Sequence, residues 1–371
     1  MNKPEVIVVG AGPGGLAATH ALLNSGLVNV TLIQKTGNAH YLPGILPVLL
    51  GLRPVSQYYH PVTLPQVHVI AGEVTGLAHG NAQLADGTTL TADAVIAAPG
   101  LSTDATSMPV GQRSFPVWEL AAAAGAQHAI HALTSGRLVV AIAALPYRCP
   151  PAPYGLAISL KALFQAREQP VEVILVTPEE RPLQALGERV SNFLESLVTT
   201  GQVTLETAFH MDNAACRDGM LVAADGRHMS YDLGLFVPPH RRPTFLDAFP
   251  GNGALVQVDA QQRTAMDRIW VVGDVAATTL PRAAGAAEAQ GRTAAASILA
   301  TLGLAEPQTP VLPTPNCYIW TGQERAARIQ LHFPHGLPPQ GKPEISLDAP
   351  DEALLADALN APLQWQKQLR Q

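Results

Sequence analysis

The chain has 371 residues, of which 47% are hydrophobic and 14% charged, with a formal charge of −6 at pH 7. This length favours two domains, or one domain with a large insertion, and the mild negative charge gives no basic surface for nucleic acid, so no nucleic-acid partner is expected. The sequence has no apolar run of about 18 residues and enters a strand-like run at once without a signal peptide, so we expect a cytoplasmic protein that does not span the membrane.

The first predicted element is a nucleotide-binding turn. The stretch EVIVVGAGPGGLAATHALLNSG at 5–26 is a β-branched run, followed by Gly10, Gly12 and Gly15 at G-x-G-x-x-G spacing, and a helical pattern closed by Gly26. A strand, a tight turn and a helix in this order aim the helix N-terminus at a pyrophosphate. We therefore predict a dinucleotide-binding domain here, and not a glycine-rich turn without a ligand.

The next strand ends in an unusual residue. VNVTLIQK at 28–35 places Gln34 where such domains usually carry an acid for the adenosine ribose. The Gln34 amide can accept a hydrogen bond but carries no charge, so the ribose contact is weakened and the site is retained. The apolar segment YLPGILPVLLG at 41–51 could wall a slot for an apolar ligand or be an ordinary core loop, and the sequence leaves both open.

A second βαβ unit is predicted within residues 106–235. Its strands are RLVVAIAA at 137–144 and VEVILVTPEE at 171–180, with a helix near 154–168 between them. This is the skeleton of a pyridine nucleotide site. The turn LPYRCPPAPYG at 145–155, however, has no glycine before Gly155, and its prolines remove amide donors that a pyrophosphate would need. We therefore do not expect NADH to bind there.

The same turn carries a cysteine. Cys149 stands before a helix and beside Arg148, and both features lower the pKa of a thiol, so the sequence predicts a reactive thiolate. The alternative is a buried, inert cysteine in a proline-rich loop. With Cys216 and Cys317 there are three cysteines, too few for a secreted disulfide framework. Cys216 precedes an expected hairpin and is interpreted as structural.

Two further segments lie close to the predicted nucleotide. ADAVIAAPG at 92–100 is an apolar strand that ends in small residues, and DRIWVVGDVA at 267–276 is a buried-type strand that ends in Gly273 and Asp274. An Ala-rich helical run follows at 280–300, and Cys317 lies in the loop PTPNCYIWTG at 313–322. Small residues at strand ends let the backbone approach a cofactor closely.

The chain ends in a predicted amphipathic helix. DEALLADALNAPLQWQKQLRQ at 351–371 carries an apolar stripe and should break near Pro362. The stripe consists of Leu354, Leu355, Leu359 and Trp365. The helix could lie on a membrane surface, or it could pack on the protein or on a second subunit.

Together these motifs resemble the flavoproteins of the pyridine nucleotide-disulfide reductase type over roughly residues 4–300. The combination of CPPAPY, NCY at 316–318 and LFVPPHRRP at 235–243 is similar to the sulfide:quinone oxidoreductases and to the flavin subunit of the flavocytochrome c sulfide dehydrogenases. The resemblance implies an α/β fold with two Rossmann-like domains. Residues 1–105 and 236–305 would form a discontinuous FAD domain, 106–235 the second domain with Cys149, and 306–371 a C-terminal extension with Cys317.

The resemblance also implies the cofactor contacts. FAD would be non-covalent, because residues 38–50 hold no cysteine that could tether it, and no metal site is expected. Asp274 would bind the ribityl chain, while the following helix and Arg282 would stabilise negative charge on the reduced flavin. The cofactor residues would be Gly10, Gly12, Gly14, Gly15, Gln34, Lys35, Val74, Ala98, Gly100, Gly273, Asp274 and Arg282.

In such enzymes the two cysteines form a redox pair at the flavin, which here would be Cys149 and Cys317. Sulfide or a related small thiol would attack the oxidised pair, leave a persulfide and release a thiolate, and the flavin would pass the electrons to quinone. The product would be zero-valent sulfur or polysulfide. Arg148 and Arg282 are candidates for attracting HS⁻. His240 and Glu288 could handle protons, or could be surface or capping residues.

Two alternatives stay open. One is an NAD(P)H-dependent FAD reductase of a quinone or disulfide, which the absent second glycine loop counts against. The other is an accessory flavoprotein whose cysteine pair acts as a redox switch. The oligomeric state, and a peripheral contact with the inner face of the membrane, are likewise left open.

Overall fold

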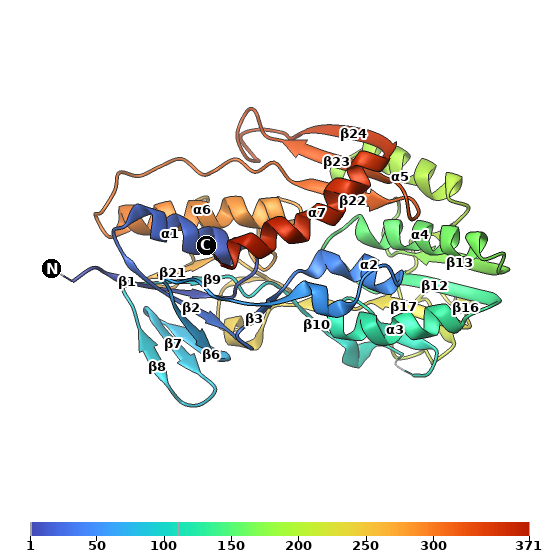
Figure 1. The fold of residues 1–371 in the computed structure, drawn as a ribbon, viewed down its shortest axis with the longest axis horizontal. Helices are drawn as coiled ribbons and strands as arrows, with labels where there is room; N and C mark the ends of the chain where they lie inside the picture. Colours follow the sequence, from blue (N-terminus) through green and yellow to red (C-terminus); the bar gives the residue numbers. More distant parts are fainter. Residues whose placement is uncertain (1, 110, 371) are drawn as a thin grey trace.

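The computed structural model describes residues 2–109 and 111–370. Its fold is α/β, as predicted, and is built on two five-stranded parallel sheets that lie side by side (Figure 1). The first sheet has the order β21 (Ile269–Val271), β9 (Ala94–Ala97), β1 (Glu5–Val9), β2 (Asn29–Gln34) and β5 (His68–Ala71).

The first sheet is the middle of three layers. Successive side chains of a strand point to opposite faces, so Val6 and Val8 pack against α1 (Pro13–Ser25) and α6 (Ala284–Thr301). Ile7 and Val9 pack on the other face, against an antiparallel sheet of β6 (Val74–Ala78), β7 (Asn81–Leu84) and β8 (Thr89–Thr91). Figure 1 shows these two layers above and below the sheet.

The second sheet also has two different faces. Its order is β11 (Ser114–Pro116), β17 (Leu233–Val237), β12 (Gly136–Ile142), β13 (Val171–Val176) and β14 (Thr204–Glu206). One face packs against α3 (Leu120–Ala132), α4 (Ala152–Ala166) and α5 (Glu188–Thr200). The opposite face is covered by residues from 209–231, including the hairpin of β15 (Met220–Val222) and β16 (His228–Ser230).

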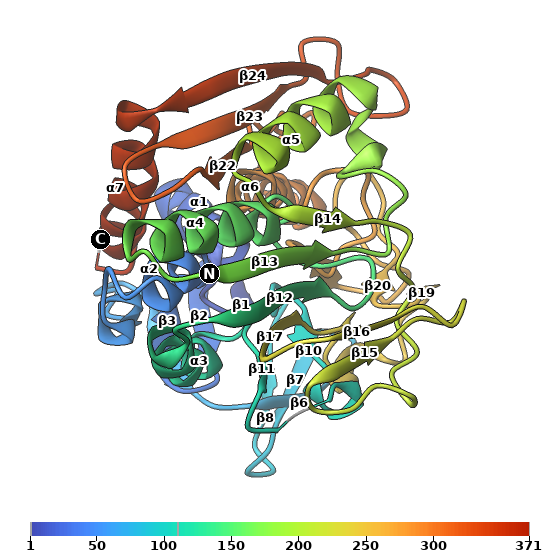
Figure 2. The ribbon, with the colours of Figure 1, turned by 90° about the vertical axis from the view of Figure 1, so that its right-hand side faces the viewer.

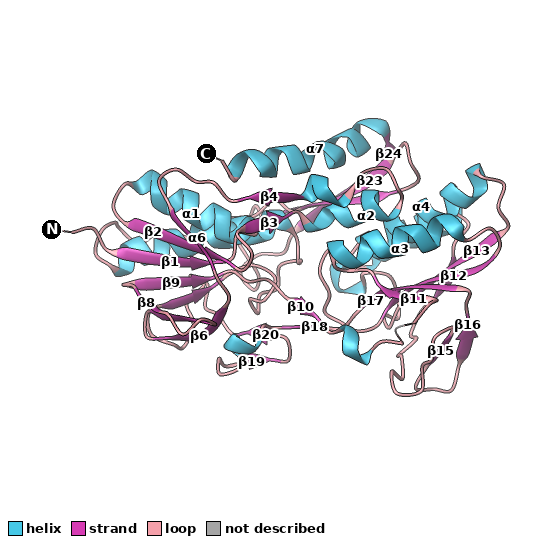
Figure 3. Cartoon of the chain, turned by 60° about the horizontal axis from the view of Figure 1, so that its bottom comes forward, coloured by secondary structure: helices cyan, strands magenta, loops and turns pink. Residues whose placement is uncertain are grey.

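The two sheets are joined by a short paired crossing. The chain leaves the first sheet through β10 (Ser102–Thr103) and returns through β18 (His240–Arg241), and the two strands pair antiparallel. Figure 3 shows both between the sheets. The domain boundaries expected after residues 105 and 235 lie near this crossing. We keep the division of the chain into four segments as a proposal.

The C-terminal part lies across both sheets. An antiparallel sheet of β22 (Asn316–Trp320), β23 (Ala326–His332) and β24 (Glu344–Asp351) packs beside α4 and leads into α7 (Glu352–Gln368) (Figure 2). The predicted break near Pro362 is wrong, because α7 continues through it. Packing outweighs the cost of the proline, about 3 kcal/mol, since Leu354 is buried with the second sheet and Trp365 with the first.

The segment at 41–51 contributes mostly to the core. It forms a 3₁₀ turn, η1 (Leu42–Gly44), and α2 (Ile45–Leu49), whose side chains are buried against α3. The remaining short elements are β3 (Asn38–His40), η2 (Val55–Tyr58), β4 (Tyr59–Pro61), η3 (Ala105–Ser107), η4 (Gln184–Leu186), η5 (Thr244–Leu246), β19 (Gly251–Asn252) and β20 (Leu255–Val256). Among the described residues, no helix has the length and apolar character needed to cross a membrane.

Candidate active site at the junction of the two sheets

The first crevice lies where the strand order of the first sheet reverses, between β1 and β9. Ligands of such sheets bind outside the carboxyl ends of the strands at this point. Gly10 there has φ of +101°, and a Cβ on it would overlap the carbonyl oxygen of Ala98. A Cβ on Gly12 or Gly100 would instead meet nothing within 4 Å. The backbone therefore forms an open cradle of the kind that a pyrophosphate can approach.

The N-terminus of α1 faces the same crevice with free donors. Its first intrahelical bond runs from the Leu16 N–H to the Gly12 carbonyl, and within the described chain Gly12 makes no side-chain cap and the first turn has no acidic residue. Unpaired N–H groups and the helix dipole favour an anion at this end. The residues present therefore fit the FAD pyrophosphate.

The predicted contacts on β2 and β6 have other partners. Gln34 Oε1 accepts a hydrogen bond from the Ala11 N–H at 2.9 Å, and its Nε2 donates to the Asn38 carbonyl at 3.0 Å. The amide thus braces the glycine turn itself. Lys35 forms an exposed ion pair with Glu73 at 2.7 Å, and the Val74 side chain is buried beneath the sheet.

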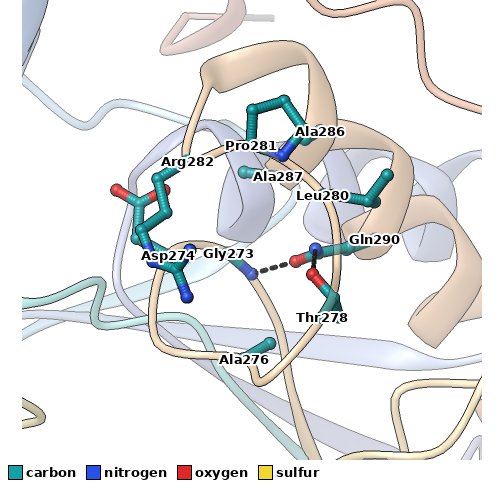
Figure 4. A pocket seen from close by; sticks show the side chains of 10 residues that line it. All are labelled: Gly273, Asp274, Ala276, Thr278, Leu280, Pro281, Arg282, Ala286, Ala287 and Gln290. Carbon is teal, nitrogen blue, oxygen red and sulfur yellow. Dashed lines mark hydrogen bonds between the residues drawn. The ribbon is translucent and has the colours of Figure 1, made fainter. Parts of the chain in front are cut away.

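The loop after β21 is held from inside by a glutamine that sequence reasoning missed. The Gly273 N–H donates to Gln290 Oε1 at 2.6 Å, and Gln290 Nε2 donates to Thr278 Oγ1 at 3.2 Å (Figure 4). The available signal was a polar side chain in an Ala-rich helix. Gln290 fixes the loop that presents Asp274, and Arg282 lines the same small pocket.

Asp274 and Arg282 are partly buried neighbours of opposite charge that line one pocket. Burial raises the pKa of the Asp274 carboxyl, while the charges of Arg148 and Arg282 oppose that shift. Burial lowers the pKa of Arg282, and Asp274 opposes it. The helix α6 begins two residues after Arg282, with no acidic residue in its first turn. These groups suit the ribityl chain and the pyrimidine edge of a flavin.

The second crevice is the equivalent point of the second sheet, between β12 and β17. The loops that leave these strands are tied together by the Ala143 N–H, which donates to the Val237 carbonyl at 3.0 Å. One loop leads to Cys149 and the other to His240. β18, which carries His240, pairs with β10, which closely follows Gly100 in the chain.

Cys149 is held in an uncommon conformation. Its φ is +54°, in the left-handed region that a non-glycine residue rarely adopts. The Cys149 N–H donates to the Arg282 carbonyl at 3.1 Å, and its own carbonyl accepts from the Ala152 N–H at 3.0 Å. The cysteine loop is thereby clamped to the loop that follows Asp274.

Cys317 is on β22 and lies close to Cys149. The strand approaches α4 so closely that a Cβ on Gly155 would lie 2.8 Å from the Trp320 nitrogen, which explains the glycine at that position. Cys317 belongs to the core cluster against which Cys149 packs, and both thiols are free. Burial raises the pKa of Cys317 to about 12, and the charge of a Cys149 thiolate adds to the shift.

The prediction of a low-pKa thiolate at Cys149 is wrong. Burial raises the pKa of its thiol to about 12, and the Asp274 charge adds to this shift. Arg148 lowers the pKa, as predicted, but its effect is the smaller one. Removing a thiolate from water costs more free energy than one neighbouring cation supplies. Cys216 is buried against the other face of the second sheet, away from this pair.

Arg148 and His240 are both buried beside the cysteine loop, at 8% and 7% exposure. Arg148 Nη2 donates to the Trp118 carbonyl at 2.9 Å and to Glu119 at 3.2 Å. His240 Nδ1 lies 2.8 Å from the Pro238 carbonyl, and burial, with Arg148 and Arg282, lowers its pKa to about 3. His240 is therefore not a surface residue.

Tyr41 and Glu288 complete the site on the side of α6 and α7. The Tyr41 ring lies 5.5 Å from that of Trp365, and burial raises its pKa, with Cys149 and Glu288 adding to the shift. Burial also raises the pKa of Glu288, which pairs with Arg292 at 3.9 Å. Tyr41 was predicted only as part of an apolar wall, so its proximity to Cys149 is new.

Comparison with known proteins agrees with this architecture. Residues 4–145 match the family of pyridine nucleotide-disulphide oxidoreductases. The sulfide:quinone oxidoreductase of the hyperthermophilic bacterium Aquifex aeolicus has a TM-score of 0.83 at 15% identity, over 99% of this chain and 91% of that one.

Two further solved structures are similar. A chain of the Tetrahymena thermophila mitochondrial ATP synthase has a TM-score of 0.74 at 15% identity, over 92% of this chain and 89% of that one. The covalent putidaredoxin reductase–putidaredoxin complex has a TM-score of 0.66 at 17% identity, over 99% of this chain and 94% of that one. At these identities the likeness establishes the fold, with its two Rossmann-like sheets.

Proposed function

We propose that this chain, an FAD-dependent oxidoreductase whose residues 4–145 match the pyridine nucleotide-disulphide oxidoreductases, oxidises sulfide through Cys149 and Cys317 and passes the electrons to a quinone. The observation that carries the proposal is the meeting of these two cysteines beside the Asp274 loop. The similarity to a sulfide:quinone oxidoreductase over nearly the whole chain supports it. FAD, when bound, would supply the two-electron acceptor.

The sulfur chemistry follows from thiol–disulfide exchange. Hydrosulfide attacks one sulfur of the oxidised Cys149–Cys317 pair, so that a new S–S bond forms as a persulfide while the old one breaks and the partner leaves as a thiolate. Removal of two electrons and one proton from the persulfide and thiolate joins them as a trisulfide. The next hydrosulfide opens this bridge, and sulfur accumulates in the zero-valent state.

The residues around the pair shape this reaction. A thiolate on either cysteine is destabilised by burial, which favours its rapid conversion back to a disulfide or trisulfide. The Cys149 clamp to the Arg282 carbonyl holds this cysteine against the cofactor loop. The half-buried carboxyl of Glu288 is suited to taking the proton that the persulfide loses.

The NAD(P)H reductase alternative is disfavoured by a second observation. Glu179 follows β13, where a dinucleotide domain presents an acid to the ribose. Here the Glu179 carboxylate accepts hydrogen bonds from Tyr154 at 2.7 Å and Thr177 at 3.2 Å and is buried. It is therefore turned into the core. The similarity to putidaredoxin reductase fits that alternative in fold only.

Anaerobic addition of sulfide to the purified flavoprotein tests the proposal. We expect rapid loss of the oxidised flavin band with sulfide, its return with a quinone analogue, and no loss with NADH. Cys149→Ser and Cys317→Ser should each abolish bleaching by sulfide while FAD stays bound, and the control Cys216→Ser should behave as wild type. Bleaching by NADH alone would overturn the proposal in favour of the reductase, and silence with both would favour the accessory flavoprotein.

A further inference from the structure

The loop that carries Cys149 has few backbone donors of its own. Proline stands at positions 150, 151 and 153, so from 149 to 153 only Cys149 and Ala152 have an amide hydrogen. Cys149 nevertheless keeps a φ of +54°, which a residue with a side chain adopts only where its surroundings impose it. Donors from side chains are therefore needed to hold the rest of this loop.

Two buried aromatic side chains supply these donors. The Trp118 indole N–H donates to the Arg148 carbonyl at 2.9 Å. The Tyr147 hydroxyl donates to the Pro150 carbonyl at 2.8 Å. These two carbonyls belong to the residues on either side of Cys149. Trp118 and Tyr147 are 1% and 3% exposed, so both hydrogen bonds lie in a medium where they are stronger than in water.

Trp118 is itself fixed by the second sheet. It lies between β11 and α3, and the N–H of the preceding residue, Val117, donates to the Phe236 carbonyl of β17 at 2.9 Å. Arg148 Nη2 donates back to the Trp118 carbonyl at 2.9 Å, so Trp118 and Arg148 are joined by a reciprocal pair of hydrogen bonds. The cysteine loop is thereby attached to the frame of the sheet.

The direction of the Cys149 side chain depends on these attachments. The φ angle sets the direction of the Cα–Cβ bond relative to the backbone, and the Cys149 N–H is held by the Arg282 carbonyl. A change to the ordinary negative φ would turn the thiol away from its present place against the core cluster that contains Cys317. We propose that Trp118 and Tyr147 are positioning residues that keep Cys149 in this conformation, ready to form the bond within the redox pair. This inference rests on the proposed function.

The positioning role predicts an effect on the redox equilibrium of the pair. Formation of the S–S bond removes two electrons and two protons from the two thiols, and in a glutathione buffer oxidised glutathione takes up both and becomes two reduced molecules. Without one of the two hydrogen bonds, the reduced loop relaxes to a negative φ. Formation of the bond must then impose the left-handed conformation again, and the cost of that conformation opposes oxidation.

Tyr147→Phe is the sharpest test, because it removes one hydroxyl and leaves the ring. The flavoprotein would be equilibrated anaerobically in graded glutathione buffers, from the reduced and from the oxidised side. After an acid quench and alkylation in urea, mass spectrometry would count the free thiols at Cys149 and Cys317. We expect the equilibrium constant for bond formation to fall about fivefold or more in Tyr147→Phe, and likewise in Trp118→Phe.

Two matched substitutions control for a general loss of stability. Tyr231→Phe removes a buried hydroxyl that lies 2.7 Å from Ser114 Oγ, on the other face of the second sheet. Trp270→Phe removes a buried indole N–H that donates to Ser297 Oγ at 3.0 Å, in the core of the first sheet. Both should leave the equilibrium constant within about twofold of wild type. An equal shift in a control and in its counterpart would overturn the positioning role.

Hydrogen exchange measures the conformation of the loop directly. The amide hydrogens of Cys149 and Ala152 are both hydrogen-bonded, and they are the only ones from 149 to 153. A peptide that covers this stretch should exchange about fivefold faster or more in Tyr147→Phe than in wild type, and at the wild-type rate in Tyr231→Phe.

The outcomes separate the positioning role from the proposed function. Wild type that forms no bond between Cys149 and Cys317 in any of the buffers would remove the proposed function, and with it the pair that the two aromatic residues serve. A bond that forms with the same equilibrium constant in wild type, Tyr147→Phe and Trp118→Phe would overturn only the positioning role. A shift in one variant alone would remove the other residue from the proposal.

Discussion

Cys149 and Cys317 differ from surface thiols in the form they adopt at neutral pH. Cys317 is buried and Cys149 is partly buried, and desolvation raises the pKa of each thiol to about 12, which keeps both protonated when the pair is reduced. Thiolates, and not thiols, react with alkylating agents. The reduced pair is therefore protected from alkylation. The cysteines become reactive toward hydrosulfide when they are oxidised and a bond joins their sulfurs.

Alkylation of the reduced protein measures this protection. At pH 8 iodoacetamide should label Cys149 about 1,000-fold more slowly than a thiol of pKa 9.0, since the two pKa values differ by about three units. The rate should rise about tenfold per pH unit up to pH 11. Mass spectrometry of the labelled peptides gives the rate, with the urea-unfolded chain as the reference. Complete labelling of the folded protein within the reference time would contradict the prediction.

His240 should make the fold sensitive to mild acid. Its pKa is lowered by burial from 6.5 to about 3, so below pH 6.5 the unfolded chain binds a proton that the folded one does not. The contribution to stability is complete above pH 6.5 and is lost as the pH falls toward 3, by at most about 1.4 kcal/mol per pH unit. Urea unfolding between pH 7 and 4 would measure the free energy of unfolding of wild type and of His240→Gln. The difference between these two free energies should narrow as the pH falls. A constant difference in the free energy of unfolding would show that His240 takes up its proton at the same pH in the folded and the unfolded chain.

At the scale of elements, close backbone contact sets the packing of the first domain. Gly291 on α6 faces Gly14 on α1, and a Cβ at position 291 would overlap the Gly14 carbonyl oxygen. This contact sets the position of α6, whose Gln290 fixes the Asp274 loop, against α1, which follows the glycine turn. Sequence alone showed both helices but not this contact, because Gly291 reads as an ordinary small residue in an Ala-rich run.

Gly291→Ala should therefore destabilise the protein and weaken FAD binding. Overpacking of this kind costs about 1–3 kcal/mol. The matched control is Gly125→Ala on α3, where a Cβ would meet nothing within 4 Å and higher helix propensity should add up to about 1 kcal/mol. Urea unfolding and FAD titration would measure both variants. Equal effects of the two substitutions would show that helix propensity, and not the contact with α1, matters at position 291.

At the scale of the whole molecule, α7 connects the C-terminal sheet with the core of the first sheet. Its start is buried beside the second sheet, and Trp365 is buried against Tyr41 and the core of the first sheet. The apolar stripe predicted from the sequence thus packs on the protein along much of its length. Leu363 on the same helix is 56% exposed.

Two substitutions on α7 test this connection. Trp365→Ala should lower the free energy of unfolding by about 3–5 kcal/mol, whereas Leu363→Ala should change it by less than about 0.5 kcal/mol. Urea unfolding followed by circular dichroism would measure both. A small loss for Trp365→Ala would mean that α7 is held mainly by its first half, at Leu354 and Leu355.

The sequence was most informative where the backbone needs a particular residue. Gly10 and the strand-to-helix turn around it could be recognised because a glycine turn has a fixed spacing, and the α/β fold followed from the order of apolar strands. The raised pKa of Cys149 and the hydrogen bond from the Ala11 N–H to Gln34 could not be predicted, because both depend on residues more than 20 positions away that reach the site only after folding. The course of α7 through Pro362 depends in the same way on the cores at its two ends.

The pairing of β10 with β18 places the two ends of the segment that forms the second sheet next to each other. Ser102 lies opposite Arg241 and Thr103 opposite His240, so everything between them leaves and rejoins the first domain within one two-stranded ribbon. For the first sheet, the segment between β10 and β18 is equivalent to a long hairpin loop, whose closure entropy grows only slowly with length. A unit with neighbouring termini can be exchanged between hosts without moving the host's strands. Because α2 and the sheet of β22, β23 and β24 share the core of the second sheet, a transplant of the Cys149 loop would have to carry those elements as well.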